Sequence, residues 1–366
     1  MKKARKKDTL LLLFAGVLLF WGGLSLLLFP APRFSATENR WLAEKPKFSF
    51  EALWGGSYTA AWERYAAERV AGRRLMRGVH ARCELALGKC QTDEVLVCSD
   101  KSLTKRLTAG NARSLQKNLS GIAKLSEKAT ANGVSLTVAV APRRIDARSC
   151  VLPALFPTSV TRAPYGALTE QLPQAVVLDG IQNDEHWYQT DHHWTTAGAY
   201  EAYCALAKQL GYKPCAMSDF TRQTVSEAFW GTTDAAAGLL DTSPDKIELW
   251  RYVGDDMLEL TKDGTRADFT GLYDYEKLMT RDGYAVFLGG NDGIIEINLG
   301  AEDPRETLLI IKDSFANSVI PFLARHYRII AIDPRYAKAD LTPYFSKADA
   351  ALLLMGMQTL AEIAMF

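Results

Sequence analysis

The sequence lacks an excess of charge of either sign, and it lacks the short cysteine motifs that commonly bind zinc. Its 366 residues include 43 Lys and Arg against 42 Asp and Glu, so no global field attracts a polyanion, and we expect no nucleic-acid partner. No C-x-x-C pair occurs among the 6 cysteines, which argues against a zinc knuckle or a thioredoxin-type motif. Internal repeats and low-complexity tracts are also missing. The remaining composition is typical of a folded globular protein.

Charged residues are absent from the run Leu10 to Phe29 near the N-terminus. As a helix this run is roughly 30 Å long, which is enough to cross a bilayer core. A basic cluster precedes it, formed by Lys2, Lys3, Arg5, Lys6 and Lys7. The positive-inside rule then predicts a cytoplasmic tail at 1–9, a transmembrane signal anchor at 10–29 and an extracytoplasmic remainder. We therefore expect a single-pass protein of the cell membrane.

A cleaved signal peptide is the alternative for the same segment. The apolar core of a signal peptide is usually roughly 7 to 15 residues, shorter than this run, and no A-x-A-like cleavage site precedes Pro30. Both observations favour an anchor that stays on the protein.

The even number of cysteines fits disulfide bonds in an oxidising compartment. They are Cys83, Cys90, Cys98, Cys150, Cys204 and Cys215. Cys204 with Cys215 is the favoured pair, because it would join a helix end to the loop that follows. Buried free thiols are the alternative.

Apolar runs alternate with amphipathic stretches after an irregular arm at 30–110, in which Pro30, Pro32 and Pro46 interrupt helices. The pattern predicts strands at 134–141, 175–179, 285–288, 307–311, 328–332 and 350–355. It predicts a helix with apolar positions from Leu115 to Ala129 that ends at Asn132 and Gly133, helices at 196–210 and 316–327, and a further helix at the C-terminus. Continuous apolar strands alternating with helices are typical of an α/β fold with a parallel sheet and helices on both faces. This domain would span 111–366, with a small β-rich insertion at 216–285.

The densest polar cluster extends from His186 to Thr195 and reads HWYQTDHHWT. In an extended segment side chains alternate, so Asp191 and His193 point the same way while His192 points the opposite way. A carboxylate beside an imidazole fixes its tautomer and stabilises the imidazolium, which is the acid and base half of a hydrolytic triad.

A nucleophile is expected at a turn from a strand into a helix. The segment from Leu308 to Ser318 reads LLIIKDSFANS, so an apolar strand leads into Ser314 and a helix follows directly. The carboxyl edge of such a sheet is where α/β sites form. The simpler alternative is that Asp313 or Ser314 only caps the helix.

Together these strings resemble the DHHW family, which is similar to the alginate O-acetylation proteins AlgX and AlgJ. The resemblance rests on six strings: SATENR at 35–40, TDHHW at 190–194, FWGT at 229–232, FLGGN at 287–291, KDSFANS at 312–318 and DPRY at 333–336. It implies a circularly permuted SGNH-hydrolase-like fold, in which D-x-H comes first and Ser follows much later.

The resemblance implies Ser314 as nucleophile, His193 as general base and Asp191 as its orienting carboxylate. Gly290 and Asn291 resemble the residues that assist the oxyanion in SGNH enzymes, although a G-G-N turn has a purely structural reading too. Arg143 and Arg335 follow predicted strands, where they would meet a substrate or form surface salt bridges.

These residues lead us to expect a membrane-anchored O-acetyltransferase or acetylesterase acting on cell-surface polysaccharide hydroxyls, with no cofactor. The resemblance further implies a membrane-bound O-acyltransferase partner. The sequence has KDSF where secreted SGNH esterases have GDSL, which predicts weak free esterase activity.

Two other functions compete with this hypothesis. The first is a metal site built from His186, Asp191, His192 and His193, although neighbouring histidines on opposite faces do not easily share one ion. The second is a non-catalytic glycan-binding or scaffolding role in a polysaccharide modification complex. Its candidate aromatic residues are Trp187, Tyr188, Trp194, Trp230, Tyr273 and Tyr275, which core packing would equally explain.

Overall fold

A computed structural model describes residues 2–28, 33–35, 38, 40–92, 95–106, 112–148, 151–153, 156 and 159–366. The chain divides into two compact units, residues 1–89 with 238–241 and residues 90–237 with 242–366. Pro30, Pro32 and Cys150 lie outside the described residues.

The first unit is mainly helical. Its helices are α1 (Lys2–Leu28), α2 (Phe50–Trp54), α3 (Ser57–Arg69) and α4 (Arg73–Ala86), and β1 (Phe34–Ser35) pairs with β2 (Arg40–Trp41). Glu68 organises the segment after β2, because its carboxylate accepts hydrogen bonds from the Arg40 guanidinium and the Ala43 amide. Among the described residues, α1 alone is long and apolar enough to cross a membrane, over Thr9–Leu26. The predicted apolar helix is therefore confirmed, and its length and composition fit both a signal sequence and an anchor.

The second unit contains an eight-stranded mixed sheet in the order β11-β10-β12-β14-β13-β15-β6-β7. Its parallel part consists of β14 (Arg328–Ile332), β13 (Thr307–Lys312), β15 (Ala350–Gly356), β6 (Leu136–Ala141) and β7 (Val176–Val177). Three strands continue it in antiparallel pairing: β12 (Ile294–Asn298), β10 (Glu259–Lys262) and β11 (Thr265–Arg266). The α/β class is thus confirmed, whereas the prediction of an entirely parallel sheet is wrong at this edge.

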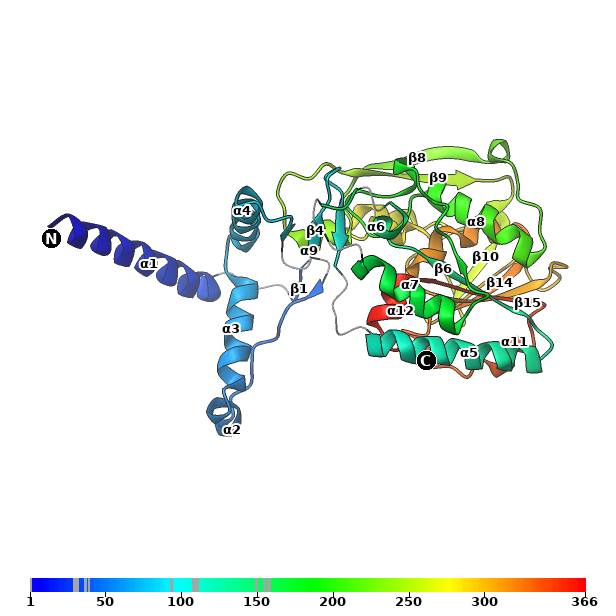
Figure 1. Cartoon of the computed structure of the whole chain (residues 1–366), viewed down its shortest axis with the longest axis horizontal. Helices are drawn as coiled ribbons and strands as arrows, with labels where there is room; N and C mark the ends of the chain where they lie inside the picture. Colours follow the sequence, from blue (N-terminus) through cyan, green and yellow to red (C-terminus); the bar gives the residue numbers. More distant parts are fainter. Residues whose placement is uncertain are drawn as a thin grey trace. The chain divides into compact units, whose positions relative to one another are not determined.

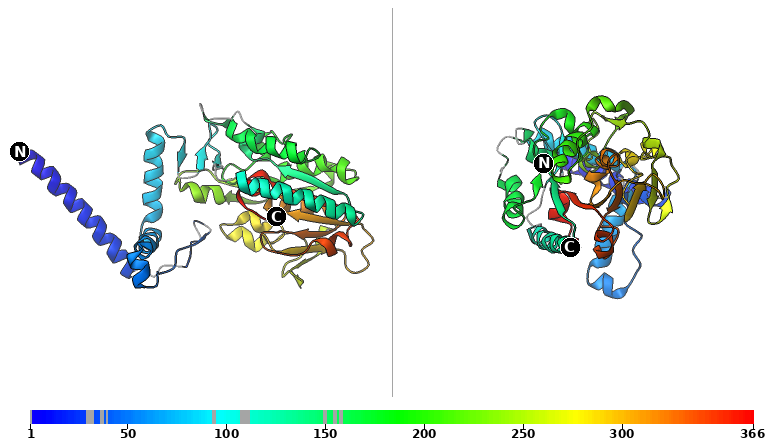
Figure 2. Two further views of the ribbon diagram at one scale, coloured as in Figure 1. Left: turned by 60° about the horizontal axis from the view of Figure 1, so that its bottom comes forward. Right: turned by 90° about the vertical axis from the view of Figure 1, so that its right-hand side faces the viewer.

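Helices cover both faces of this sheet (Figures 1 and 2). On one face, Leu309, Ile311 and Leu353 pack with residues of α5 (Ala112–Ala131), α7 (Ser159–Gln171), α11 (Thr342–Phe345) and α12 (Met357–Glu362). On the other face, the alternate residues Leu308, Ile310 and Leu352 pack with α8 (Thr196–Leu210) and α10 (Ile320–Leu323). Because side chains alternate along a strand, apolar residues at every position are needed to fill both cores.

The predicted strands and helices agree best where the pattern is long and regular. Helix α8 has the predicted bounds, with Gly211 as its left-handed C-cap, and β14 has the predicted bounds as well. The strand predicted at 285–288 is wrong, because Gly283–Val286 form the 3-10 helix η7 and Leu288, Gly289 and Gly290 all have positive φ. The helix predicted at 316–327 is instead the 3-10 turn η8 (Ser314–Ser318) followed by the short α10.

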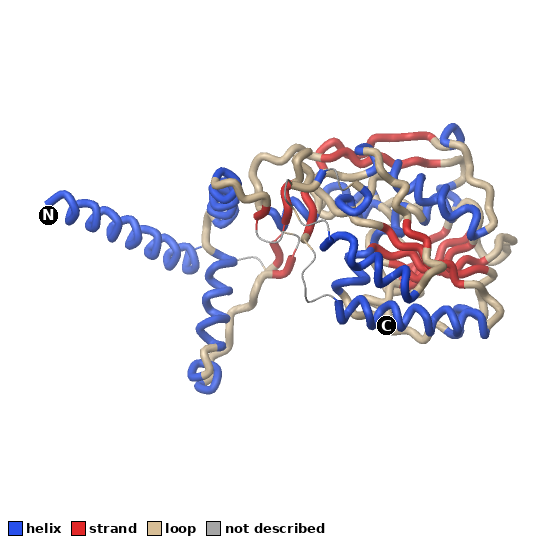
Figure 3. The backbone as a smooth tube through the Cα atoms, in the orientation of Figure 1, coloured by secondary structure: helices blue, strands red, loops and turns tan. Residues whose placement is uncertain are grey.

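The region between α8 and η7 contains a long antiparallel pair, β8 (Thr221–Phe229) with β9 (Asp245–Arg251), visible in Figure 3. Strands β10 and β11 of the same region belong to the main sheet. Cys204 and Cys215 are free thiols, so the favoured disulfide is not formed; Cys83, Cys90 and Cys98 are also free.

Candidate active site

Ser314 lies two residues after the end of β13, at the first position of η8. Asp313 caps this turn, because one carboxylate oxygen accepts from the Phe315 amide at 3.0 Å and the other accepts from the Gly356 amide at 2.8 Å. Asp313 is therefore the cap of this turn, and the Ser314 hydroxyl is left to face the neighbouring loop.

The Ser314 hydroxyl meets His193, whose Nε2 lies 2.8 Å from Oγ. His193 Nδ1 lies 2.6 Å from Asp191 Oδ1, which also accepts from the His193 backbone amide at 3.1 Å. All three residues are buried. The structure thus brings Asp191, His193 and Ser314 into one hydrogen-bonded chain, as the motif order predicts.

The second carboxylate oxygen of Asp191 is held by Thr232. It accepts from the Thr232 amide at 2.7 Å and from its hydroxyl at 3.0 Å. Burial raises the pKa of Asp191, but the adjacent His192 and His193 and these hydrogen bonds outweigh it and hold the pKa far below its ordinary value. Asp191 is therefore a fixed anion beside the imidazole.

Two aromatic side chains hold the imidazole and the serine turn in place. Tyr284 stacks on His193 with ring centroids 3.8 Å apart and an interplanar angle of 4°, and its hydroxyl donates to the Ser314 carbonyl at 3.2 Å. The Trp194 indole donates to Ser318 Oγ at 2.9 Å and to the Phe315 carbonyl. Trp194 therefore joins the loop that carries His193 to the turn that carries Ser314.

His192 lies beside this chain: its Nδ1 is 3.2 Å from Thr232 Oγ1 and 3.3 Å from Asp191 Oδ1, and its ring centroid is 3.8 Å from that of His193. The prediction that His192 points opposite to Asp191 and His193 is therefore wrong, because the segment is a turn and not an extended strand. Burial and the neighbouring His193 lower the pKa of His192 to about 3, against the opposing effect of Asp191. His192 is consequently neutral near pH 7 and takes no part in the chain of hydrogen bonds between Asp191 and Ser314.

Gly290 and Asn291 differ in what they offer. The Gly290 amide donates to the Phe287 carbonyl at 3.1 Å, so this N–H is already used. Asn291 accepts hydrogen bonds at Oδ1 from Asn317 Nδ2, at 3.1 Å, and from Lys312 Nζ, at 3.3 Å. Asn317 belongs to the turn of Ser314, so these contacts bring Asn291 next to the serine turn.

The two predicted arginines both form ion pairs with nearby aspartates. Arg143 pairs in bidentate fashion with Asp146, at 2.8 and 2.7 Å, and is buried. Arg335 pairs in the same way with Asp333, at 2.9 and 2.6 Å, and is close enough to His192 to contribute to its lowered pKa.

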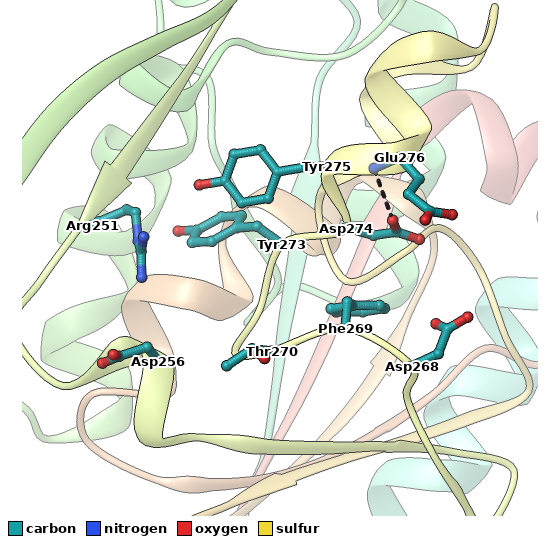
Figure 4. Close-up of a pocket in the computed structure, with 9 residues that line it drawn as sticks. All are labelled: Arg251, Asp256, Asp268, Phe269, Thr270, Tyr273, Asp274, Tyr275 and Glu276. Atoms are coloured by element: carbon teal, nitrogen blue, oxygen red, sulfur yellow. Dashed lines mark hydrogen bonds between the residues drawn. The ribbon is translucent and has the colours of Figure 1, made fainter.

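A separate pocket of about 380 Å³ opens beside the 3-10 helix η6 (Tyr275–Met279). Phe269 and Tyr275 line it together with several carboxylates, and Arg251 lies at its edge (Figure 4). None of its lining residues belongs to the chain of Asp191, His193 and Ser314. Of the aromatic residues considered for glycan binding, Trp187, Tyr188 and Trp194 are core residues instead.

Asp191, His192 and His193 also offer metal-ligand atoms within 4.8 Å of one another. This donor set suits an ion poorly, because both ring nitrogens of His193 are engaged, one with Asp191 and the other with Ser314. His186 is not part of this group.

Sequence reasoning missed the parts of Tyr284, Thr232 and Lys312 in this site. Thr232 and Lys312 lie in the FWGT and KDSFANS strings, so the motif contained them without indicating what they contact. Tyr284 stands outside every string, and no local pattern indicates that its ring stacks on His193.

Comparison with known proteins gives a family match and similar folds. Residues 176–332 match the family described as DHHW protein. A DHHW family protein from Eubacterium siraeum is 20% identical, with a TM-score of 0.61 over 75% of this chain and 94% of that chain.

PatB1 of Bacillus cereus with a sulfonyl adduct is 19% identical, with a TM-score of 0.60 over 74% of this chain and 97% of that one. A second PatB1 structure is 20% identical, with a TM-score of 0.59 over 74% and 98% of the two chains. These similarities establish the fold. No curated protein sequence matches the chain significantly.

Proposed function

Starting from the chain's membership in the DHHW family, we propose that it is an acyl-transfer enzyme that uses Ser314 as nucleophile. The observation that carries this proposal is the 2.8 Å contact between His193 Nε2 and Ser314 Oγ, continued by the 2.6 Å contact to Asp191. A base within hydrogen-bond reach of the nucleophile, itself oriented by a third group, is the arrangement that activates serine hydroxyls.

In the first half of the reaction, Ser314 Oγ attacks the carbonyl carbon of the acyl donor and its proton passes to His193 Nε2. The tetrahedral intermediate then collapses, the bond to the donor oxygen breaks, and that oxygen takes the proton from Nε2. The acyl group is left as an ester on Ser314.

In the second half, an acceptor hydroxyl gives its proton to Nε2 and attacks the acyl-enzyme. Collapse transfers the acyl group to the acceptor and returns the proton to Ser314. A sugar hydroxyl as acceptor gives transferase activity, and water gives esterase activity. Asp191 stays ionised throughout and stabilises the imidazolium.

Two hydrogen-bond donors are available for the oxyanion. Among the described residues, the Ser314 amide and Asn291 Nδ2 have no hydrogen-bond partner. A site that stabilises the developing negative charge needs such donors free and fixed before the substrate arrives. Gly290 would contribute only after its amide leaves the Phe287 carbonyl.

We further propose that the fold is a circularly permuted SGNH-hydrolase-like one, since Asp191 and His193 precede Ser314 in the chain. The acyl group would be acetyl and the acceptor a hydroxyl of a cell-surface polysaccharide. In this proposal α1 anchors the enzyme with its catalytic domain outside the cell membrane, beside a membrane-bound O-acyltransferase partner.

The test uses the full chain in detergent, incubated with an activated acetyl ester. Native protein should release the alcohol and gain one acetyl group by intact mass, and Ser314→Ala and His193→Ala should do neither. Ser318→Ala is the matched control, because Ser318 lies in the same turn but contacts Trp194 and Tyr284 instead of His193. Labelling that persists in Ser314→Ala would overturn the acyl-enzyme mechanism.

The pocket beside η6 supports a second candidate, a non-catalytic glycan-binding role. Aromatic faces such as Phe269 and Tyr275 suit the C–H surfaces of sugars, and carboxylates accept their hydroxyl protons. Glycan binding that is lost in Tyr275→Ala and kept in Ser314→Ala, with no turnover by the native protein, would favour this role.

A further inference from the structure

Lys312 is a fully buried charged residue that the reaction described above does not use. It is the last residue of β13, two positions before Ser314, and none of its side chain is exposed. It continues the strand face of Leu308 and Ile310, which pack in the core. Burying an ammonium group costs several kcal/mol unless specific partners compensate it, so its contacts indicate what it does.

The nearest partners of Lys312 Nζ are the side-chain oxygens of two asparagines. Asn317 Oδ1 lies at 2.6 Å and Asn291 Oδ1 at 3.3 Å. The nearest carboxylate, Asp333, is farther away at 3.8 Å and is already paired in bidentate fashion with Arg335. Lys312 is therefore primarily a donor to amide oxygens.

These contacts decide which way both carboxamides face. A lysine ammonium has donors and no acceptor, so each asparagine must turn its oxygen toward it. Asn317 Nδ2 then donates to Asn291 Oδ1 at 3.1 Å and to the Gly290 carbonyl at 3.3 Å. With two donors on Asn291 Oδ1, the Nδ2 group on the other side of the carboxamide faces away from Lys312 and Asn317, and within the described part of the chain it has no partner.

We propose that Lys312 is a positioning residue that fixes the Asn291 carboxamide with its Nδ2 donor free for the oxyanion formed at Ser314. This inference rests on the proposed acyl-transfer function and adds the group that keeps one oxyanion donor correctly oriented. Without Lys312, the carboxamide of Asn291 can rotate and offer its oxygen, which repels an oxyanion.

The charges around Lys312 are consistent with a donor that stays protonated at neutral pH. Burial lowers its pKa to about 8; Asp333, Asp313 and Asp292 raise it, and Arg335 lowers it. The ammonium form, with all its donors, therefore predominates where the acyl transfer is to be measured.

A double-mutant cycle on the full chain tests the inference, with Lys312→Met, Asn291→Ala and the pair assayed with the activated acetyl ester. Loss of one oxyanion donor costs about 100-fold or more in kcat, so we expect at least about a 10-fold lower kcat for Lys312→Met, with KM little changed. In the Asn291→Ala background the same change should cost less than about threefold, because the group it orients is gone. Equal losses in both backgrounds would overturn the inference.

Lys262→Met is the matched control. Lys262 donates to the Gly289 carbonyl at 3.0 Å and pairs with Asp292, so it supports the same loop without touching the Asn291 side chain. Its effect should be the same with and without Asn291. If Lys312→Met does not fold, Lys312→Gln, which keeps an uncharged donor, replaces it in the cycle.

A second readout does not depend on turnover. In protein labelled with 15N-asparagine, the Asn291 side-chain amide signals are identified by their loss in Asn291→Ala. They should be sharp in the native protein and shifted or broadened in the Lys312 variant. Signals that do not change in the Lys312 variant would overturn the inference, whether or not the native protein shows turnover. Absence of Ser314-dependent turnover would by itself refute only the proposed function.

Discussion

Asp191→Asn tests whether the fixed anion beside His193 is required for activity. Asp191 accepts four hydrogen bonds, two from His193 and two from Thr232. Asparagine has one acceptor oxygen and one NH₂ donor in their place. If its oxygen stays with Thr232, the NH₂ faces His193 Nδ1, which must then give up its proton. The proton moves to Nε2, the atom that should receive the proton of Ser314.

The expected loss of kcat is about 10⁴-fold, the size found for this substitution in a serine protease triad, which corresponds to about 5 kcal/mol of transition-state stabilisation. The effect on folding should be smaller, because the shape is kept while hydrogen bonds to a charged group, each worth about 1.5–3 kcal/mol, are weakened. Activity should therefore fall much more than stability.

The assay compares kcat/KM for the activated acetyl ester with the free energy of unfolding in urea. Asp245→Asn is the matched control, since Asp245 is a half-buried carboxylate that accepts from the Gln189 and Thr190 amides of the same loop without contacting His193. It should lower stability while kcat/KM falls less than about tenfold. If Asp191→Asn retained more than a tenth of the native kcat/KM, the orienting role of Asp191 would be refuted.

The pH dependence of stability gives an independent check on the same residue. Because the folded-state pKa of Asp191 is lowered, its contribution to stability is present above the unfolded carboxyl pKa of about 4 and is lost as the pH falls below it. Native protein should lose stability below about pH 4 more steeply than Asp191→Asn. Parallel curves would show that the carboxylate is not stabilised by folding.

Other residues of the site give further predictions. Gly231→Ala should reduce kcat strongly in a folded protein, because the new Cβ would lie 2.3 Å from Asp191 Oδ2; a native kcat would show that the loop adjusts freely. Tyr284→Phe keeps the ring on His193 and should lower the free energy of unfolding by about 1 kcal/mol, with kcat changed less than fivefold. Tyr284→Ala removes the ring and should lower kcat further. Equal kcat values for the two variants would argue against the stacking role. Dialysis against a chelator should leave turnover unchanged, since both ring nitrogens of His193 are engaged by side chains, and activity restored only by added metal would revive the metal site. In His192→Ala, the fall of kcat/KM toward acidic pH should remain as in the native protein. His192 has its pKa lowered to about 3, so it is neutral at neutral pH and does not cause this fall. Loss of the fall in the variant would contradict this.

The parallel core of the sheet was predictable because its strands are buried on both faces and are therefore apolar over most of their length. Helix α8 was predictable for a related reason, since its period is regular and Gly211 marks its end. The antiparallel edge was not predictable, because an apolar run carries no information about strand direction. β12 was missed because it is exposed at alternate positions.

The site was predictable as a set of residues and not as a geometry. Motif order identified Asp191, His193 and Ser314, and the structure brings these three together. The apolar run before Gly289 predicts a strand, although the segment is a loop, because a buried loop and a buried strand have the same composition. The stack of Tyr284 on His193 depends on that loop's conformation, so it was not accessible from the sequence.

The long sequence separations within the site have a consequence for how the protein matures. Ser314 and His193 are 121 positions apart, and Asp191 is held by Thr232 from 41 positions away. A fragment that lacks either segment cannot assemble the site, so in an unfolded chain Ser314 would be an ordinary serine and not the activated nucleophile that we propose. The fraction of Ser314 that an acylating reagent modifies rapidly would then measure the fraction of correctly folded molecules in a purified sample.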